Sequence, residues 1–187
     1  MDALTALHTR NSINLLTEPG PNQEQLHNII KAGLRACDHG RLRPWRYLII
    51  EGEALNSFGS LMAKVKGTID GETLSEDSAK KISAKALRAP MIIAVAAKTT
   101  EHPKVPEIEQ FLSAGASAQM MMTAAHAQGI GAIWRSGALM FDQSMHEGLG
   151  LNDNEKLVGF IYLGTPKIAK PIEQLECTDY IEYWGGK

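Results

Sequence analysis

The chain has 187 residues, of which 44% are hydrophobic and 21% charged, with a net charge of −2 at pH 7 and a pI near 6.3. These values are ordinary for one globular domain over residues 1–187, and they argue against a nucleic-acid-binding protein, which normally carries a basic excess. The longest apolar run, residues 91–97, is too short to cross a bilayer, and the first residues lack the pattern of a signal peptide. We therefore expect a cytoplasmic protein that makes no membrane contact.

Residues 2–9 predict a short helix at the start of the chain. A Pro-Gly-Pro turn at 19–21 precedes Asn22, which is a candidate N-cap, and Gln25 stands three residues later in the position of a capping box. The residues that follow repeat apolar side chains at helical spacing, which predicts an amphipathic helix.

Further along, four segments predict strands: 47–51, 91–97, 131–135 and 157–163. Four more segments predict helices: 53–66, 76–87, 106–128 and 142–148. The helix at 106–128 carries small residues on every side at 113–118, which indicates a central position. Because helices precede the first strand and strand–helix alternation is imperfect, the pattern favours an α+β sandwich with a mixed sheet. The polar segment after Thr165 ends in aromatic residues, which suggests that it packs on another surface, such as a partner subunit.

The sequence contains none of the common motifs of a self-sufficient active site. It has no Walker loop, no His-Glu-x-x-His and no Gly-x-Ser-x-Gly. Residues 129–134 contain Gly-x-Gly, but the third glycine is missing and the order is helix to strand, the reverse of a dinucleotide-binding loop. The histidines lack metal-ligand spacing, and Cys37 and Cys177 form no Cys-x-x-Cys pair. We predict no metal site and no catalytic side chain, so an enzyme with this sequence would depend on a cofactor.

Three separate segments carry groups suited to an anion. Residues 35–46 hold four arginines and a histidine, residues 10–12 read Arg-Asn-Ser, and residues 134–137 read Trp-Arg-Ser-Gly. Each segment alone is also explained by a solvated loop, a helix cap or a surface ion pair. Together they offer guanidinium groups, hydroxyls and small residues, which suit a planar, phosphorylated ligand.

The same residues resemble the nitroreductase family of flavoproteins, especially its compact bacterial members, over nearly the whole chain. The resemblance rests on these segments: 1–4, 10–12, 35–39, 44–45, 104–106, 113–115, 127–137 and 159–166. The Trp-Arg-Ser-Gly and Leu-Gly-Thr-Pro blocks are its most specific parts.

This resemblance implies a three-layer α+β sandwich with a mixed, mainly antiparallel sheet flanked by helices. It also implies a homodimer with two FMN molecules at the subunit interface. The implied FMN-binding residues are Arg10, Asn11, Ser12, Trp134, Arg135 and Ser136 of one subunit, with Arg35 and His39 reaching across from the partner. NAD(P)H would be the reductant, and residues 124–129 would lie near its nicotinamide nucleotide.

The activity implied is a ping-pong hydride transfer from NAD(P)H through FMN to a small electron-poor acceptor, such as a nitroaromatic or a quinone. One alternative is a non-catalytic flavin-binding or flavin-fragmenting homologue on the same scaffold. Another is a plain anion-binding or structural dimer, which would be colourless.

The chain departs from the family pattern at several positions. Asn11 and Leu15 stand where basic residues are common, Cys37 stands where proline is frequent, and Arg43 stands where glutamine often precedes Pro-Trp. The loss of two basic residues predicts weaker contacts to FMN, and Arg41 or Arg43 could compensate for them.

Overall fold

One sheet organises the computed structural model, which describes residues 1–168 and 170–185. Its long central strand β5 (Glu155–Pro166) pairs on one side with β3 (Met91–Lys98), which in turn pairs with β2 (Trp45–Glu51). On its other side, β5 pairs with β4 (Gly131–Arg135) and with the short β1 (Leu16–Thr17). All these pairings are antiparallel, so the expected mixed sheet is wrong for the described residues of this single chain.

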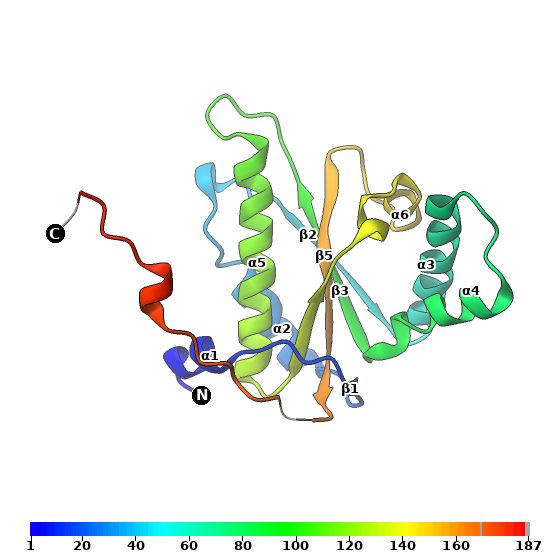
Figure 1. The fold of residues 1–187 in the computed structure, drawn as a ribbon. Helices are drawn as coiled ribbons and strands as arrows, with labels where there is room; N and C mark the ends of the chain where they lie inside the picture. The colour runs from blue at the N-terminus through cyan, green and yellow to red at the C-terminus, as the bar shows by residue number, and fades with distance from the viewer. Residues whose placement is uncertain (169, 186–187) are drawn as a thin grey trace.

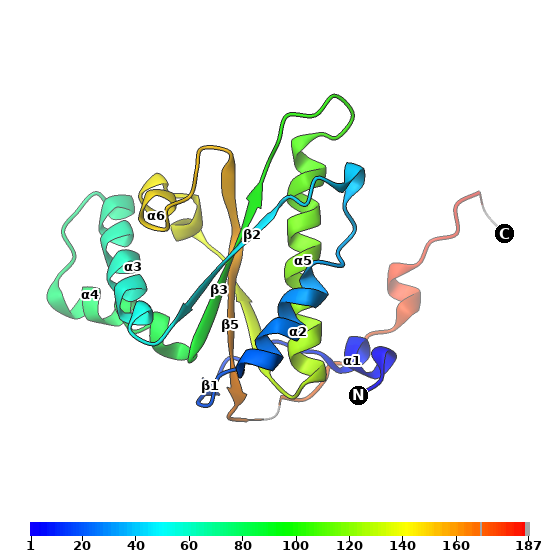
Figure 2. The same ribbon diagram turned by 180° about the vertical axis from the view of Figure 1, so that it is seen from behind.

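Helices cover both faces of this sheet (Figures 1 and 2). On one face lie α2 (Gln23–Gly33) and α5 (Glu107–Ala127), with α1 (Ala3–Thr9) beside the end of α5. On the other face lie α3 (Ala54–Asp70), α4 (Glu76–Ser83) and α6 (Gln143–Gly148). The described part of the chain is therefore a three-layer α+β sandwich.

Side chains of the central strands point alternately to the two faces of the sheet and form two separate hydrophobic cores. Ile93 and Ile161 are buried in the core beneath α2 and α5, whereas their neighbours Ile92 and Phe160 are buried in the core beneath α3. Successive strand residues point to opposite faces, so a strand covered on both sides has a continuous apolar sequence. This explains why β3 is buried from Met91 to Ala97.

The helix boundaries follow local capping chemistry. The side chains of Asn22 and Gln25 form the predicted reciprocal capping box at the start of α2. The predicted helix at 76–87 is wrong in its last four residues. The α-helix α4 ends at Ser83, and a separate 3₁₀ turn, η2 (Ala86–Arg88), leads into β3.

The small residues of α5 allow α2 to approach very closely. A Cβ atom at Gly33 of α2 would lie 2.8 Å from Met121 Cγ and 2.9 Å from Ser117 Oγ. Ser117 also forms a 2.5 Å hydrogen bond with the hydroxyl of Tyr47 on β2. The predicted central position of this helix is confirmed, because α5 contacts both α2 and the sheet.

The segment after β5 leaves the body of the protein (Figure 1). It contains the 3₁₀ turn η4 (Cys177–Tyr180) and exposes several large apolar side chains: Ile172, Leu175, Tyr180, Ile181, Tyr183 and Trp184. Among the described residues, no helix combines the length and the apolar composition needed to cross a membrane.

Candidate functional site

The predicted segments 10–12 and 134–136 lie at the two ends of β4. The backbone N–H of Ile13 donates to the carbonyl of Ala132 at 3.0 Å, which holds the segment after α1 beside the beginning of this strand. Residues 134–136 form the other end of β4 and the turn that follows it. One short strand thus brings together residues more than a hundred positions apart in the sequence.

Arg10 ends α1 and is half-buried. Thr9 precedes it, and Thr9 Oγ1 lies 2.9 Å from Nε2 of His126 in the last turn of α5. This contact ties the end of α1 to the end of α5 and fixes the backbone from which the Arg10 side chain projects.

Asn11 has a partner that the sequence did not reveal. Its amide Nδ2 donates to the carbonyl oxygen of Lys170 at 2.9 Å, and both residues line a cavity of about 320 Å³ beside His126. Asn11 therefore anchors the segment after β5, while the adjacent Ser12 is half-buried.

Trp134 and Arg135 project to opposite faces of the sheet, as neighbouring strand residues must. Trp134 packs on the α5 side, against Gly159 of β5, where a Cβ atom would lie 2.1 Å from the indole Nε1. On the other face, the guanidinium carbon of Arg135 lies 5.4 Å from the centre of the Tyr162 ring. This separation is within the range of a cation–π contact.

Beside Arg135 lies a cavity of about 530 Å³ whose lining carries four cationic residues. These are Lys66 at the end of α3, Lys85 and Arg88 around η2, and Arg135 itself. No aspartate, glutamate or histidine is among the described residues that line it. Burial raises the pKa of Tyr162, and Arg135 and Arg88 act on it in the opposite direction. Lys66 is already paired with Asp70 on α3, so Lys85, Arg88 and Arg135 are the cations that suit the cavity to an anionic ligand.

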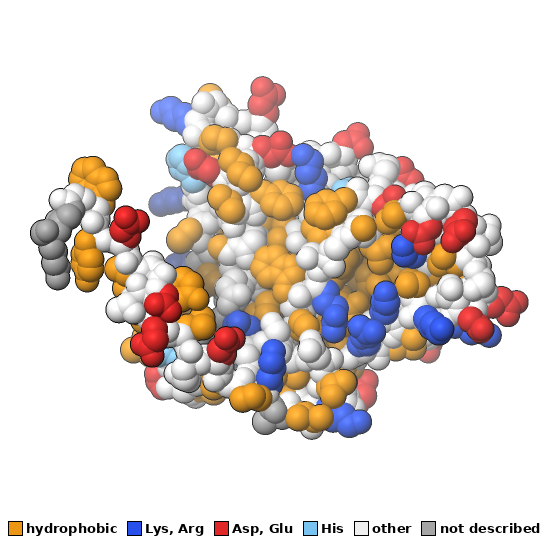
Figure 3. Space-filling model, viewed as in Figure 1, with side chains coloured by type: hydrophobic (Ala, Val, Ile, Leu, Met, Phe, Trp, Pro, Cys, Tyr) orange, Lys and Arg blue, Asp and Glu red, His pale blue; other side chains and the backbone are white. Residues whose placement is uncertain are grey.

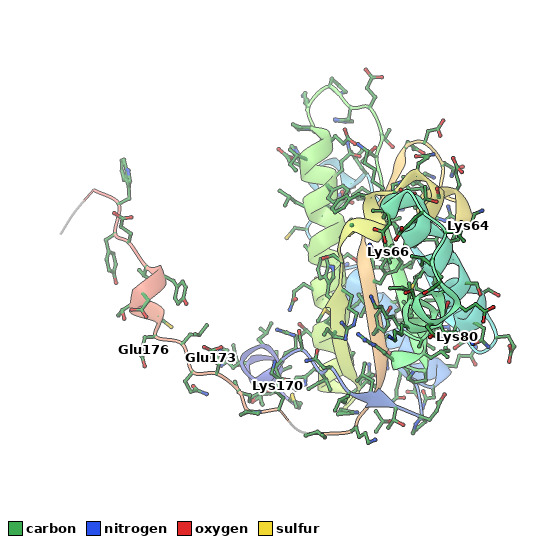
Figure 4. The ribbon with its side chains drawn as sticks, turned by 45° about the vertical axis from the view of Figure 1, so that its right-hand side comes forward. Lys64, Lys66, Lys80, Lys170, Glu173 and Glu176 are labelled. Atoms are coloured by element: carbon green, nitrogen blue, oxygen red, sulfur yellow. The ribbon has the colours of Figure 1, made fainter. Side chains whose placement is uncertain are left out.

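The cationic lining is visible on the surface. Figure 3 shows lysine and arginine side chains gathered on this face of the molecule, and Figure 4 places Lys66 on α3 beside the chain that follows β4. Sequence reasoning missed Lys66, Lys85 and Arg88. The available signal was weak, consisting of basic residues just before the buried strand β3 and at the end of a helix.

His39 lies far from Arg10 within the same chain, and Arg35 stands four residues before His39 in the sequence. Both are exposed in the loop after α2, and His39, in the 3₁₀ turn η1 (His39–Arg41), pairs with Glu109 at the start of α5 at 2.6 Å. Glu109 and His126 are 17 residues apart on α5, which is about 26 Å along a helix. The structure therefore does not bring His39 to the Arg10 end of β4 in one chain.

Arg41 and Arg43 belong to the same loop as His39. Both have positive φ, +56° and +52°, and the Asp38 carboxylate accepts hydrogen bonds from the backbone N–H groups of Leu42 and Arg43. Within a single chain, these two arginines are thus at the Glu109 end of α5 and do not replace basic residues at positions 11 and 15.

Two buried guanidinium nitrogens indicate whether the site fits a phosphorylated cofactor. Arg10 Nη1 and Arg135 Nε are buried, and neither has a hydrogen-bond partner among the described residues. A buried donor without an acceptor costs about 1–3 kcal/mol, so both ends of β4 favour a ligand that brings acceptor oxygens. FMN has such oxygens on its phosphate, ribityl chain and ring, so the residues present fit this cofactor. Among the described residues, no cluster of His, Cys, Asp and Glu is arranged to hold a metal ion.

Comparison with known proteins defines the class of this chain. A sequence model described as "Nitroreductase family" matches residues 8–165, and the chain belongs to this family. It is 41% identical over 186 residues to "Putative NAD(P)H nitroreductase YdjA" of Escherichia coli (strain K12), an alignment that covers 98% of this chain and all of the relative.

The fold is also found in solved structures. The chain is similar to a nitroreductase-like family protein from Bacillus cereus, with a TM-score of 0.81 and 21% identity over 98% of this chain and 96% of that one. It is similar to the FMN and NADPH-dependent nitroreductase NfnB of sphigopyxis sp. strain HMH, with a TM-score of 0.75 and 16% identity over 99% of this chain and 100% of that one. At these identities, the likeness establishes the fold.

Proposed function

We propose that this protein is an FMN-dependent oxidoreductase that uses NAD(P)H to reduce small electron-poor acceptors, such as nitroaromatics and quinones. Membership of the nitroreductase family supports this activity, as does the dependence of NfnB, a protein of similar fold, on FMN and NADPH. The observation that carries the proposal is a pair of buried guanidinium nitrogens, on Arg10 and Arg135 at the two ends of β4, that find no hydrogen-bond partner in the described part of the chain. We place the activity in the cytoplasm, where NAD(P)H is available.

In this proposal, one subunit holds FMN through the residues at the two ends of β4: Arg10, Asn11, Ser12, Trp134, Arg135 and Ser136. When bound, FMN supplies the hydride-accepting and hydride-donating chemistry. Arg10 and Arg135 donate charge-assisted hydrogen bonds, the serine hydroxyls donate or accept, and Trp134 walls the site on the α5 side. Residues 124–129, which form the end of α5 and the turn after it, lie near the nicotinamide nucleotide.

The chain's own residues orient the reactants and stabilise negative charge in this mechanism. The 530 Å³ cavity beside Arg135 is lined by cations and contains no carboxylate or imidazole among its described lining residues. Such an environment stabilises electron-rich species without a dedicated acid or base, since fixed positive charge is effective in a partly desolvated site.

We infer that the working form is a homodimer. His39 pairs with Glu109, about 26 Å along α5 from His126 and the neighbouring Arg10 in its own chain, so we assign His39 and the preceding Arg35 to the flavin of the partner subunit. Exposed apolar residues support this arrangement. Leu4 on α1 is 63% exposed, Leu112 on α5 is 64% exposed, and Trp184 beyond β5 is fully exposed. Large exposed apolar side chains that gather on one side commonly mark an interface.

The first test is the visible absorption spectrum of the purified protein, with and without added FMN, followed by anaerobic NADPH or NADH. We expect flavin bands that bleach with at least one nucleotide. Bands that persist with both would identify a flavin binder without this reductase activity. No bands after FMN addition would refute the proposed cofactor and leave only the fold.

The second test is Arg10→Ala. Removal of a charge-assisted hydrogen bond worth about 1.5–3 kcal/mol should weaken FMN binding by about 10- to 100-fold. Flavin fluorescence quenching measures the dissociation constant directly. Lys81→Ala, on the exposed surface of α4, is the control and should bind FMN normally. Unchanged flavin content and NADPH oxidation in Arg10→Ala would show that the assignment of Arg10 is wrong.

A further inference from the structure

His126 lies beside the proposed flavin site but is outside the set of residues that the sequence predicts to bind FMN. Its Nε2 is 2.9 Å from Thr9 Oγ1, and that hydroxyl is 2.6 Å from the carbonyl oxygen of Thr5. Because a hydroxyl has one proton and a carbonyl only accepts, Thr9 donates to Thr5 and accepts from Nε2–H of His126. This hydrogen bond therefore sets the tautomer of the neutral ring and leaves Nδ1 as the atom that takes up a proton.

The charged residues placed around His126, among those that the structure describes, are cationic. Arg10 follows Thr9 at the end of α1, and Lys170 of the segment after β5 lines the same 320 Å³ cavity as His126. No carboxylate is among the described residues that line this cavity. Burial and the charge of Arg10 lower the pKa of His126. The carbonyl groups at the end of α5 act in the opposite direction, since a helix C-terminus favours a positive histidine.

A negatively charged ligand would change the balance of these effects on the pKa of His126. In the free protein, a proton on His126 is repelled by Arg10, whose Nη1 is buried without a partner among the described residues. A phosphate bound by Arg10 neutralises that repulsion and attracts the protonated ring. Linkage makes the effect reciprocal, because a ligand that favours protonation is itself bound more tightly by the protonated form.

We propose that His126 is an auxiliary cationic residue at the phosphate end of the flavin site, so that FMN binding is coupled to proton uptake by His126. This inference rests on the proposed function, because it takes Arg10 as a phosphate ligand. His126 is a positioning and charge-supplying residue in this role, and it takes no part in hydride transfer.

The direct test follows the ring protons of His126 by NMR between pH 5 and 8, in full-length wild-type protein stripped of flavin. The titration is repeated with saturating FMN and with riboflavin, which has the same ring system but no phosphate. We expect FMN to raise the pKa of His126 by about half a unit or more and riboflavin to leave it unchanged. An equal effect of both flavins, or no effect of FMN, would overturn the inference.

A binding experiment provides an independent readout. The ratio of the riboflavin to the FMN dissociation constant is measured at pH 8 and 5.5 in wild type and in His126→Gln. Glutamine keeps a donor for Thr9 but cannot gain a charge. The phosphate of FMN itself titrates with a second pKa of about 6, and this affects wild type and variant alike. Dividing the wild-type ratio of dissociation constants by the variant ratio therefore cancels the contribution of the phosphate. We expect this quotient to rise about twofold or more as the pH falls.

The outcomes separate this inference from the function on which it rests. If wild type binds FMN and the quotient stays constant with pH, the role of His126 is refuted while the flavoprotein assignment stands. If wild type binds neither flavin at any pH, the proposed function fails, and this inference fails with it.

Discussion

Gly159 on β5 is the residue on which the position of Trp134 depends. A Cβ atom there would lie 2.1 Å from the indole nitrogen, so Gly159→Ala must displace Trp134 from the end of β4. We expect a loss of about 1–3 kcal/mol in the free energy of unfolding, a changed tryptophan emission spectrum and weaker flavin binding. Urea denaturation and fluorescence titration measure these effects.

The matched control is Gly115→Ala on α5, which faces the same tryptophan. Its Cβ would lie 3.8 Å from Trp134 Cη2, which is an ordinary contact, and alanine is favoured over glycine within a helix. This variant should be as stable as wild type or more stable. Equal behaviour of the two variants would contradict the tight packing at Gly159.

The polar segments of the candidate site could be predicted from the sequence, but the cationic residues that line the cavity beside them could not. The Arg10–Ser12 and Trp134–Ser136 segments were recognisable because consecutive polar residues stand next to predicted elements. Lys66 and Lys85 were not recognisable, because their side chains reach the cavity only when the end of α3 and the turn η2 pack against β4. Convergence of this kind depends on tertiary structure, which a local pattern does not encode.

Between elements, an ion pair between a partly exposed arginine and a buried carboxylate joins β2 to the beginning of β5. Arg46 Nη1 lies 2.6 Å from Glu155 Oε2, and the Glu155 side chain is 1% exposed. Burial alone would raise the pKa of Glu155, but hydrogen bonds from Asn152 and Arg46 outweigh it, so the pKa lies below its ordinary value. This carboxylate thus stabilises the fold above about pH 4.5, its ordinary pKa, and the contribution is lost as the pH falls through the lower folded-state pKa.

We therefore expect Arg46→Met to lower the free energy of unfolding by about 2 kcal/mol at pH 7 and by much less at a pH below the lowered folded-state pKa of Glu155. Chemical denaturation at both pH values provides the measurement. Lys156→Met is the control, because Lys156 pairs with Glu107 at 2.6 Å but both side chains are about half exposed. An exposed pair of this kind contributes less than about 1 kcal/mol. A pH-independent effect of Arg46→Met would argue against the role of the Glu155 charge.

Elements with strong local signals were predictable from the sequence, and elements that depend on neighbours were not. The capping box at Asn22 and the long helix α5 follow from residues close together in the chain. The two residues of β1 form a strand only because Thr165 and Pro166 of β5 lie opposite them. The expectation of a mixed sheet was wrong because strand direction depends on the connections between strands, which hydrophobic periodicity does not reveal.

For the whole molecule, the proposed dimer places the exposed outer face of α5 against the partner. Leu112→Glu would bury a carboxylate in that interface, where an unpaired charge is costly. We expect the dimer dissociation constant to rise at least about tenfold and the retained FMN to fall. Light scattering over a range of concentrations measures the assembly. Lys64→Glu, an exposed change on α3 (Figure 4), should leave it intact. A dimer of normal strength in Leu112→Glu would place the interface elsewhere.

The close packing of α2 on α5 has a mechanical consequence for this assembly. Gly33 leaves no free space against Met121 and Ser117, so α2 restrains α5 from bending. The 21 residues of α5 form a helix about 31 Å long, which we expect to move as one rigid element. One end of α5 carries Glu109, which pairs with His39, the residue that the proposed dimer assigns to the partner's flavin, and the other end carries His126 beside Arg10. In the proposed dimer, a small tilt of α5 would therefore move residues of both flavin sites at the same time, so that a change at one site is transmitted to the other through this helix.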